Sequence, residues 1–407
     1  MSRYNINLLF LYLLNISFVV ISYFLHQKFQ QTHKYSEFEY FLIFQVLYFL
    51  WWKFSNFELK NKWHLLFIGF LFLGSEPLFE NDHYRYFWEG KVIAGGYNPY
   101  KLAPNSKKLN HIEFSKRTQI SYNKLTTIYP PLAQVFFTLL SPLKYKTALM
   151  LMQSIGLLML IYIVFNLFPS NKKYLLLIYP YLCKEFVQAV HIDILACLIL
   201  LIFLNKNKVF TGIYLSFLTK IISILALPFY FFKGVLTNRK LLMKTLVCSS
   251  LVLVTLLLYP TDLSYHSGAS AFVKFWSWNS LISIILVNQK FSQNEIRIIS
   301  LLLFSASYAY LLFLFYKSNR DQVKKYISVS YMFLFLFAPV LHPWYLIWPM
   351  IWAIPNKWYF YFLFSSFLAY YPYGSSVLEV YAECIQFCLL GIAIYKELKT
   401  LSIKCID

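Results

Sequence analysis

Residues 75–104 read SEPLFENDHYRYFWEGKVIAGGYNPYKLAP, and residues 128–134 read IYPPLAQ. The first stretch is a long polar segment that opens directly after an apolar run ending near Phe79. Ionisable groups beside a lipid bilayer are costly, so a dense cluster of them marks a functional site. We therefore interpret this segment as the part that carries chemistry, and the apolar runs around it as membrane helices.

The start of the polar segment has the spacing of a helix. If residues 82–92 are helical, side chains at i, i+3, i+4 and i+7 fall on one stripe of the helix surface. Glycines at positions 95 and 96 and prolines at 99 and 104 predict where the helix stops and the chain turns back toward the membrane. The stripe would carry two carboxylates, a guanidinium and a phenol, from Asp82, Arg85, Tyr86 and Glu89.

Composition fixes the fold class. The chain has 407 residues, of which 59% are hydrophobic, and its mean hydropathy is +0.54. A soluble domain does not bury a core of that size, so the sequence predicts an all-α, polytopic transmembrane helical bundle. The first apolar run has no small-residue cleavage site after it, so we interpret it as a retained helix and not as a signal peptide.

The apolar runs predict about 12–14 membrane helices in a single integral membrane domain, residues 1–407. Several runs are shorter than the roughly 20 residues of a full crossing, so we expect broken or buried helices. The ten residues Pro131–Leu140 follow a proline and are interpreted as a juxtamembrane or re-entrant helix. We expect spans at about residues 6–25, 38–56, 62–79, 147–168, 174–184, 190–204, 209–219, 221–233, 242–260, 295–316, 325–341, 343–354, 357–371 and 377–396.

The net charge of +20 indicates membrane orientation and not nucleic-acid binding. Lys and Arg stand in short clusters between apolar runs, as in loops held on the cytoplasmic side, and the sequence contains no basic domain. This bias predicts a cytoplasmic amino terminus, an extracytoplasmic loop over residues 79–131 and a second outer loop over 261–294. Lys28 and Lys34 fall outside, against the rule. Five of the six cysteines lie in apolar segments, so no disulfide framework or metal spacing follows.

In this topology four outer segments meet on one membrane face. They are the 79–131 loop, Cys183–Asp193, Thr261–Ser280 and the turn His342–Tyr345. A site built between them would lie at the edge of the bilayer.

Three motifs in fixed order carry a resemblance to a known family. They are N-D-x-Y-R-Y-x-W-E-G from Asn81, G-G-x-N-P-Y from Gly95 and Y-P-P-L-A from Tyr129. Together they resemble the first extracytoplasmic loop of polytopic GT-C glycosyltransferases, closest to the bacterial mannosyltransferase-like subgroup that uses polyprenyl-phosphate mannose. Where that subgroup often has two adjacent acids, this chain has Asn81-Asp82, which puts a mechanism or metal site that needs both acids in doubt.

The resemblance implies an inverting transferase of the GT-C type. It would move a hexose from a polyprenyl-phosphate sugar to a lipid or glycan acceptor at the outer face of a bacterial plasma membrane. The resemblance favours mannose as this hexose. Its partners would be that donor, the acceptor and membrane lipids, with no nucleic acid. The resemblance makes no cofactor certain, and a divalent metal is compatible with it. The sequence contains no P-loop or dinucleotide fingerprint, which argues against a soluble nucleotide-sugar donor.

Sugar transfer needs a base for the acceptor hydroxyl and cations for the departing phosphate. Asp82 occupies the acidic position that the resembling enzymes use as base; the alternative is an Asp that favours the helix dipole. Arg85 could contact the donor phosphate or pair with Glu89 or Asp82. Tyr86 could stack on a sugar or join an interfacial aromatic belt. Glu89 could act directly or stabilise the helix.

Four residues later in the chain match the same subgroup. His191 and Asp193 resemble its H-x-D motif and could hold the acceptor, a phosphate or a metal; the alternative for His191 is a buried imidazole that bonds a backbone carbonyl. Lys220 could bind the donor phosphate or snorkel to the headgroups. His342 belongs to an H-P-W-Y turn, which could line the lipid-phosphate groove or end a helix at Pro343.

Two other functions stay open at this point. A transporter or flippase of a lipid-linked glycan would concentrate charge near the bilayer midplane, often in inverted repeats, whereas here the charge gathers at the predicted outer edge and no repeat is visible. A catalytically silent protein of the same fold is the third possibility.

Overall fold

The structure is a computed structural model, and it describes residues 2–32, 38–54, 63–78, 80–167, 180–258, 267–287, 289–318, 322–373 and 376–402. Over these ranges the chain is helical, with a single isolated bridge between Trp278 and Val340 and no strand. The prediction of an all-α protein is confirmed. The predicted span 174–184 and the outer segment from residue 261 fall partly outside the described residues.

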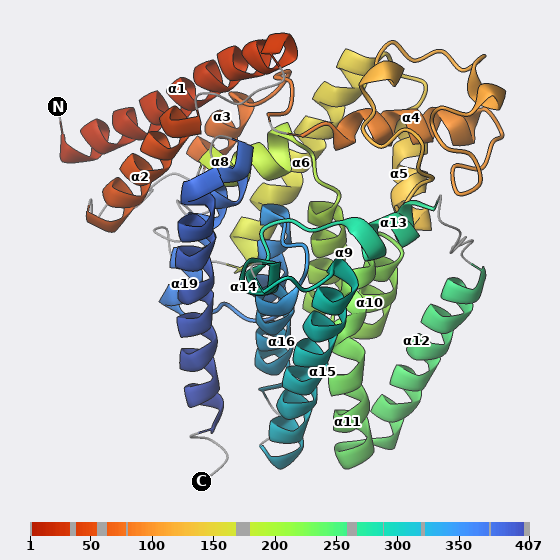
Figure 1. Cartoon of the computed structure of the whole chain (residues 1–407). Helices are drawn as coiled ribbons and strands as arrows, with labels where there is room; N and C mark the ends of the chain where they lie inside the picture. The colour runs from red at the N-terminus through yellow and green to blue at the C-terminus, as the bar shows by residue number, and fades with distance from the viewer. Residues whose placement is uncertain are drawn as a thin grey trace.

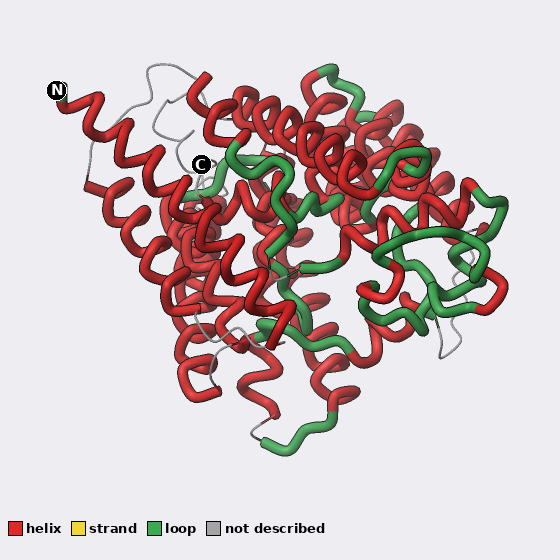
Figure 2. Tube along the Cα trace, turned by 90° about the horizontal axis from the view of Figure 1, so that it is seen from above, coloured by secondary structure: helices red, strands yellow, loops and turns green. Residues whose placement is uncertain are grey.

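Three helices at the amino-terminal end form one corner of the molecule (Figure 1, red and orange). They are α1 (Arg3–Thr32), α2 (Phe38–Phe54) and α3 (Trp63–Phe70), and Figure 2 shows α1 and α2 running side by side. The predicted span 62–79 is wrong beyond Phe70, because α3 ends there. Gly74 follows with a left-handed φ of +75°, and its N–H donates to the Gln153 side chain across 2.7 Å. Between Phe70 and Gly74 the backbone continues in turns, and a tertiary contact fixes the end of this segment.

The polar segment forms a compact cap on the bundle, with α4 (Asp82–Ala94) and α5 (Pro131–Leu140) at its base (Figure 1). The predicted helix from Asp82 and the predicted short helix from Pro131 are both confirmed. Between them lie two short 3-10 turns, η1 (Lys107–Leu109) and η2 (Arg117–Gln119). α4 and α5 approach closely at Gly90, where a Cβ atom would collide with the Phe137 carbonyl. Because glycine has no Cβ atom, it alone allows the two backbones to approach this closely.

The rest of the chain forms the bundle, and many of its elements are short. Its first part comprises α6 (Tyr145–Leu167), α8 (Pro180–Cys183), the π-helical turn η3 (Lys184–Gln188), α9 (Asp193–Asn205), α10 (Val209–Phe217), η4 (Ile221–Ala226), α11 (Leu227–Thr237) and α12 (Arg239–Leu258). Its second part comprises α13 (Gly268–Phe275), α14 (Leu281–Val287), α15 (Gln293–Lys317), α16 (Val323–Phe337), η6 (Pro343–Ile347), α17 (Trp348–Trp352), α18 (Lys357–Ser365), η7 (Ser366–Tyr373) and α19 (Ser376–Ser402).

Within the described residues, four helices are long and apolar enough to cross a membrane on their own. They are Arg3–Phe24 of α1, α6, α12 and α15. α12 and α15 present most of their apolar surface outward, with Leu257 and Leu258 more than three-quarters exposed. A helix that is apolar on all sides and has an exposed face is stable in contact with lipid. The other apolar segments are shorter, as expected for broken or buried helices: η4 and α11, for example, together make one interrupted helical run.

Two apolar cores hold the cap and the bundle together. The larger core fills the bundle, and a smaller one lies beneath α4, where Tyr86 packs on Phe137 of α5 and Phe87 on Tyr145 of α6. Buried aromatic rings of this size dominate packing energetics. α4 is consequently fixed against the bundle, and its first turn has a defined position.

Candidate active site

A cavity of about 90 Å³, open to the outside on one side, lies where the cap meets the bundle. Its walls come from the cap, from the segment before α9, from α13 and from the turn before η6, so the predicted meeting of four segments is observed. Seven of the eight candidate residues line the cavity: Asp82, Arg85, Tyr86, His191, Asp193, Lys220 and His342.

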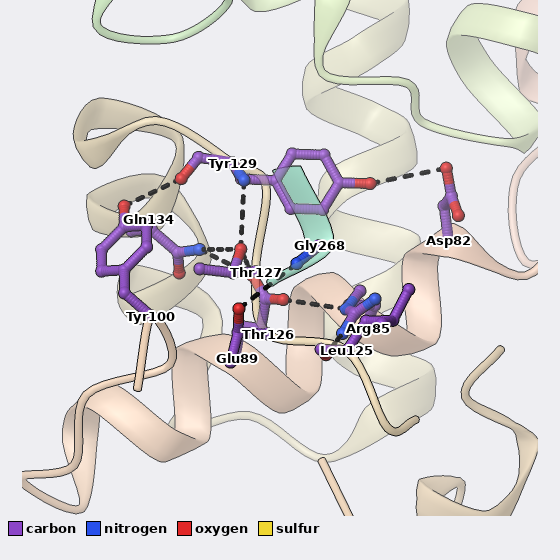
Figure 3. A network of polar contacts seen from close by, with 10 residues as sticks. All are labelled: Asp82, Arg85, Glu89, Tyr100, Leu125, Thr126, Thr127, Tyr129, Gln134 and Gly268. Atoms are coloured by element: carbon purple, nitrogen blue, oxygen red, sulfur yellow. Dashed lines mark hydrogen bonds and ion pairs between the residues drawn. The ribbon is translucent and has the colours of Figure 1, made fainter. Parts of the chain in front are cut away.

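Asp82 is the first residue of α4, and its carboxylate forms no ion pair with another described residue. Its Oδ2 accepts a long contact from the Tyr129 hydroxyl across 3.4 Å (Figure 3). Burial and the nearby Asp82 carboxylate raise the pKa of Tyr129 well above its usual value, so this phenol remains a donor. Among the described residues, no Lys, Arg or His nitrogen lies within ion-pair distance of Asp82. Asp82 is therefore a carboxylate with acceptor capacity left over.

Glu89 lies behind the cavity wall and acts as a brace. Its Oε1 contacts the Arg85 Nε across 3.0 Å, and its Oε2 accepts from Thr127 and Gln134, each across 2.6 Å (Figure 3). Burial raises the pKa of Glu89, and the Arg85 charge opposes that rise. These bonds tie α4 to α5 and to the segment that returns from the cap. Glu89 has the helix-stabilising position that was the alternative to a direct role.

Arg85 forms an ion pair and also lines the cavity. It has the intrahelical pair with Glu89, and its guanidinium also donates to the Leu125 carbonyl. Tyr86, the next residue, is 1% exposed and stacks on Phe137 with ring centroids 4.6 Å apart and planes 8° apart. One face of the Tyr86 ring is thus occupied within the protein.

Asp193 and Lys220 form an ion pair in the cavity floor. The Lys220 Nζ lies 3.0 Å from Asp193 Oδ2, and the Trp348 indole donates to Oδ1 across 3.0 Å. The Lys220 ammonium also sits 4.9 Å above the centre of the Tyr345 ring. Asp193 is 1% exposed whereas the Lys220 side chain is 22% exposed, so the ammonium is the member of the pair that a ligand reaches.

The two candidate histidines sandwich one indole. The ring of Trp344 stacks on His191 at 3.6 Å and on His342 at 4.2 Å between centroids. The His191 Nε2 lies 3.3 Å from Glu185 Oε2, so a carboxylate takes the place of the backbone carbonyl that we considered for this imidazole. Val190, just before it, has φ of +53°, a strained value for a β-branched residue.

A largely buried polar chain continues away from His191. Glu185 contacts Lys184 across 3.1 Å, and the Tyr370 hydroxyl lies 3.0 Å from a Glu185 oxygen and 2.8 Å from a Glu80 oxygen. Burial raises the pKa of Glu80 to about 8, while the Lys184 charge acts in the opposite direction. Sequence reasoning did not identify Glu80 and Tyr370. Glu80 stands two residues before Asp82, and that proximity was the available signal.

The sequence interpretation also missed most of the aromatic lining. Tyr129 was identified only as the start of the Y-P-P-L-A motif, and Tyr122, Phe272 and Trp276 were not singled out, yet all line the cavity. In a chain with 21% aromatic residues, single rings carry little signal. Within the described ranges, no three His, Cys, Asp or Glu side chains are grouped as a metal ion would require.

The fold and this cavity define a class: a polytopic helical membrane protein with a polar site between a loop-borne cap and its bundle. Two family models match the chain. Alpha-(1->6)-mannopyranosyltransferase, N-terminal domain, matches residues 70–235, and MptB C-terminal domain matches residues 279–377. Each of the eight candidate residues falls in one of these ranges. No curated protein and no solved structure matches the chain. The chain belongs with the GT-C mannosyltransferase-like proteins, and these family models support mannosyl transfer as its activity.

Proposed function

We propose that the chain transfers mannose from a polyprenyl-phosphate donor to a hydroxyl acceptor with inversion at the sugar carbon. One observation carries this proposal: Asp82, which has no ion-pair partner among the described residues, lines the same cavity as Lys220 and Arg85. A base with acceptor capacity and two cations in one cavity are the parts that glycosyl transfer from a phosphate requires.

In the proposed reaction Asp82 takes the proton of the acceptor hydroxyl. The acceptor oxygen forms a bond to the sugar C1 while the bond from C1 to the phosphate oxygen breaks, and the phosphate leaves with the electron pair. Lys220 and Arg85 stabilise the negative charge that grows on this leaving group. The partial exposure of Lys220 and the position of Arg85 in the wall support these roles.

We also propose that the site faces the extracytoplasmic side of a bacterial plasma membrane and that residues 79–131 act as the catalytic loop of one integral membrane domain. The arrangement of Lys and Arg clusters supports this orientation. The exposed apolar surfaces of α12 and α15 support a membrane location. A lipid-anchored donor would then enter from the bilayer edge.

The test is product formation by purified protein with labelled polyprenyl-phosphate mannose and a mannoside acceptor. Asp82→Asn keeps size and polarity but removes the base, and it should lower transfer by about 100-fold or more. Glu113→Gln, at an exposed acidic residue of the same cap, is the matched control and should keep full activity. Full activity of Asp82→Asn would contradict the proposal. Movement of the intact labelled lipid without a new glycosidic bond would instead indicate a flippase.

A further inference from the structure

The mouth of the cavity has an aromatic wall made by two segments far apart in sequence. Tyr122 comes from the cap and Trp276 follows α13, and their ring centroids lie 4.3 Å apart with planes inclined by 54°. Phe272 of α13 stands 5.9 Å from Trp276. All three side chains line the cavity.

The rings of this wall are more available than others in the cavity. Tyr122 is 58% exposed, and Phe272 and Trp276 are partly exposed. Trp344, by contrast, is covered on both faces by His191 and His342. Tyr122 also has a left-handed φ of +53°, which costs a non-glycine residue free energy. The fold holds an exposed aromatic ring in a strained conformation at the cavity mouth.

The wall stands on the side of the candidate base. Asn81, next to Asp82, donates to the Ser121 hydroxyl across 2.6 Å, and Ser121 precedes Tyr122. The Asp82 carboxylate, second to burial, also raises the pKa of the Tyr122 hydroxyl. The wall is therefore adjacent to the group that would take a proton from the acceptor.

α13 is fixed to the cap, so the side chains of the wall have a defined position relative to one another. The Gly268 N–H points to the Thr126 hydroxyl (Figure 3), and a Cβ atom at position 268 would collide with the Thr126 carbonyl. At the other end of α13, the Arg297 guanidinium donates to the carbonyls of Val273 and Trp276. Both ends of the helix are thus anchored.

From this geometry we propose that Tyr122, Trp276 and Phe272 form the acceptor subsite and that its ligand is a saccharide. This inference rests on the proposed function, because it takes the side of the base as the acceptor side. A sugar ring has a C–H face that packs on the negative face of an aromatic ring. Its hydroxyl rim needs hydrogen-bond partners, and the amide of Asn81 and the hydroxyl of Ser121 line the cavity beside the wall.

An interfacial belt is the other common use of exposed aromatic residues in membrane proteins. Belt residues face the headgroups, whereas Tyr122 and Trp276 face a cavity that also contains Asp82 and Asn81. The cavity position favours ligand contact over membrane anchoring.

The experiment measures binding of α-(1→6)-linked mannotriose to the full chain in nanodiscs, by calorimetry, without any donor. Trp276→Ala and Tyr122→Ala should each weaken binding by about fivefold, since a specific aromatic contact is removed. Trp276→Phe, which keeps a ring, should recover most of the affinity. Phe275→Ala removes an exposed ring of α13 that does not line the cavity, and this variant should bind mannotriose as the wild type does.

With donor present, Trp276→Ala should raise KM for mannotriose and leave kcat and the donor KM near their wild-type values. Unchanged mannotriose affinity in Trp276→Ala, or absence of mannotriose binding by the wild type with transfer only to a lipid alcohol, would overturn the proposal. Asp82→Asn should still bind mannotriose. If that variant also keeps full transfer activity, the assignment of the base fails while the binding results stand, so the two failures are distinguishable.

Discussion

Lys220 and Asp193 meet across 3.0 Å in the floor of the cavity, and Trp348 holds the second oxygen of the carboxylate. The pair joins the first residue of α9 to the turn between α10 and η4. The cation is the exposed member, so the floor presents positive charge to the cavity while the negative charge remains buried.

Asp193→Leu should destabilise the protein, because it leaves the Lys220 ammonium without its counterion. Breaking a buried pair costs about 3–5 kcal/mol; since Lys220 is 22% exposed, we expect about 2 kcal/mol here. The double variant Asp193→Leu with Lys220→Met should recover part of the loss. Thermal unfolding of the two single variants and the double variant gives the coupling energy, and strictly additive effects would contradict a direct interaction.

Gly90→Ala should separate α4 from α5 and lower stability by about 1–3 kcal/mol, the usual cost of overpacking. The new methyl group would meet the backbone carbonyl of Phe137, which cannot rotate away. Gly95→Ala is the matched control, because a Cβ atom there makes only ordinary contacts. Melting temperatures of the two variants check this prediction, and equal values would refute it. Transfer activity should fall in Gly90→Ala, since α4 carries Asp82.

Glu89→Gln should cost about 1–3 kcal/mol, the range for an unsatisfied buried donor. Arg85, Thr127 and Gln134 all donate to the Glu89 carboxylate. An amide in its place would turn an NH₂ group toward at least one of these donors. Chemical unfolding should show the loss, and Glu113→Gln at an exposed position should not. A Glu89→Gln variant as stable as the wild type would show that the hydrogen bonds to this carboxylate do not stabilise the fold.

Glu80 predicts a pH dependence of stability. Its pKa is raised to about 8 in the folded protein, chiefly by burial, from an ordinary value of 4.5. Between these two values the folded state binds more protons than the unfolded state, so stability should fall as pH rises from about 4.5 to 8. Glu80→Gln should remove this component. Melting temperatures at pH 5 and pH 8.5 provide the measurement; parallel decreases in wild type and variant would count against the raised pKa.

Local signals were sufficient to predict the cap helix. The stripe from Asp82 to Glu89 has helical spacing, and the glycines after Ala94 end the helix where the structure ends it. Pro130 likewise precedes a helix that begins at Pro131. Alternation of charge and apolar runs also predicted which four segments surround the cavity, because topology alone brings them to one end of the bundle.

Partnerships between distant residues could not be predicted in the same way. Tyr370 donates to Glu80 across 290 positions of sequence, and Gln153 of α6 accepts from the Gly74 N–H after α3. Neither contact produces a periodic pattern in the sequence, because each depends on packing that only the complete fold determines. The aromatic wall has the same origin: Tyr122 and Trp276 come from segments that α13 brings together.

The sandwich of Trp344 between His191 and His342 has a consequence for biosynthesis. Asp82 and His191 precede His342 in the chain, so both are synthesised before the turn that completes this wall of the cavity. A chain that stopped before His342 would carry the Asp82 carboxylate without this wall, so the proposed transfer should require the turn.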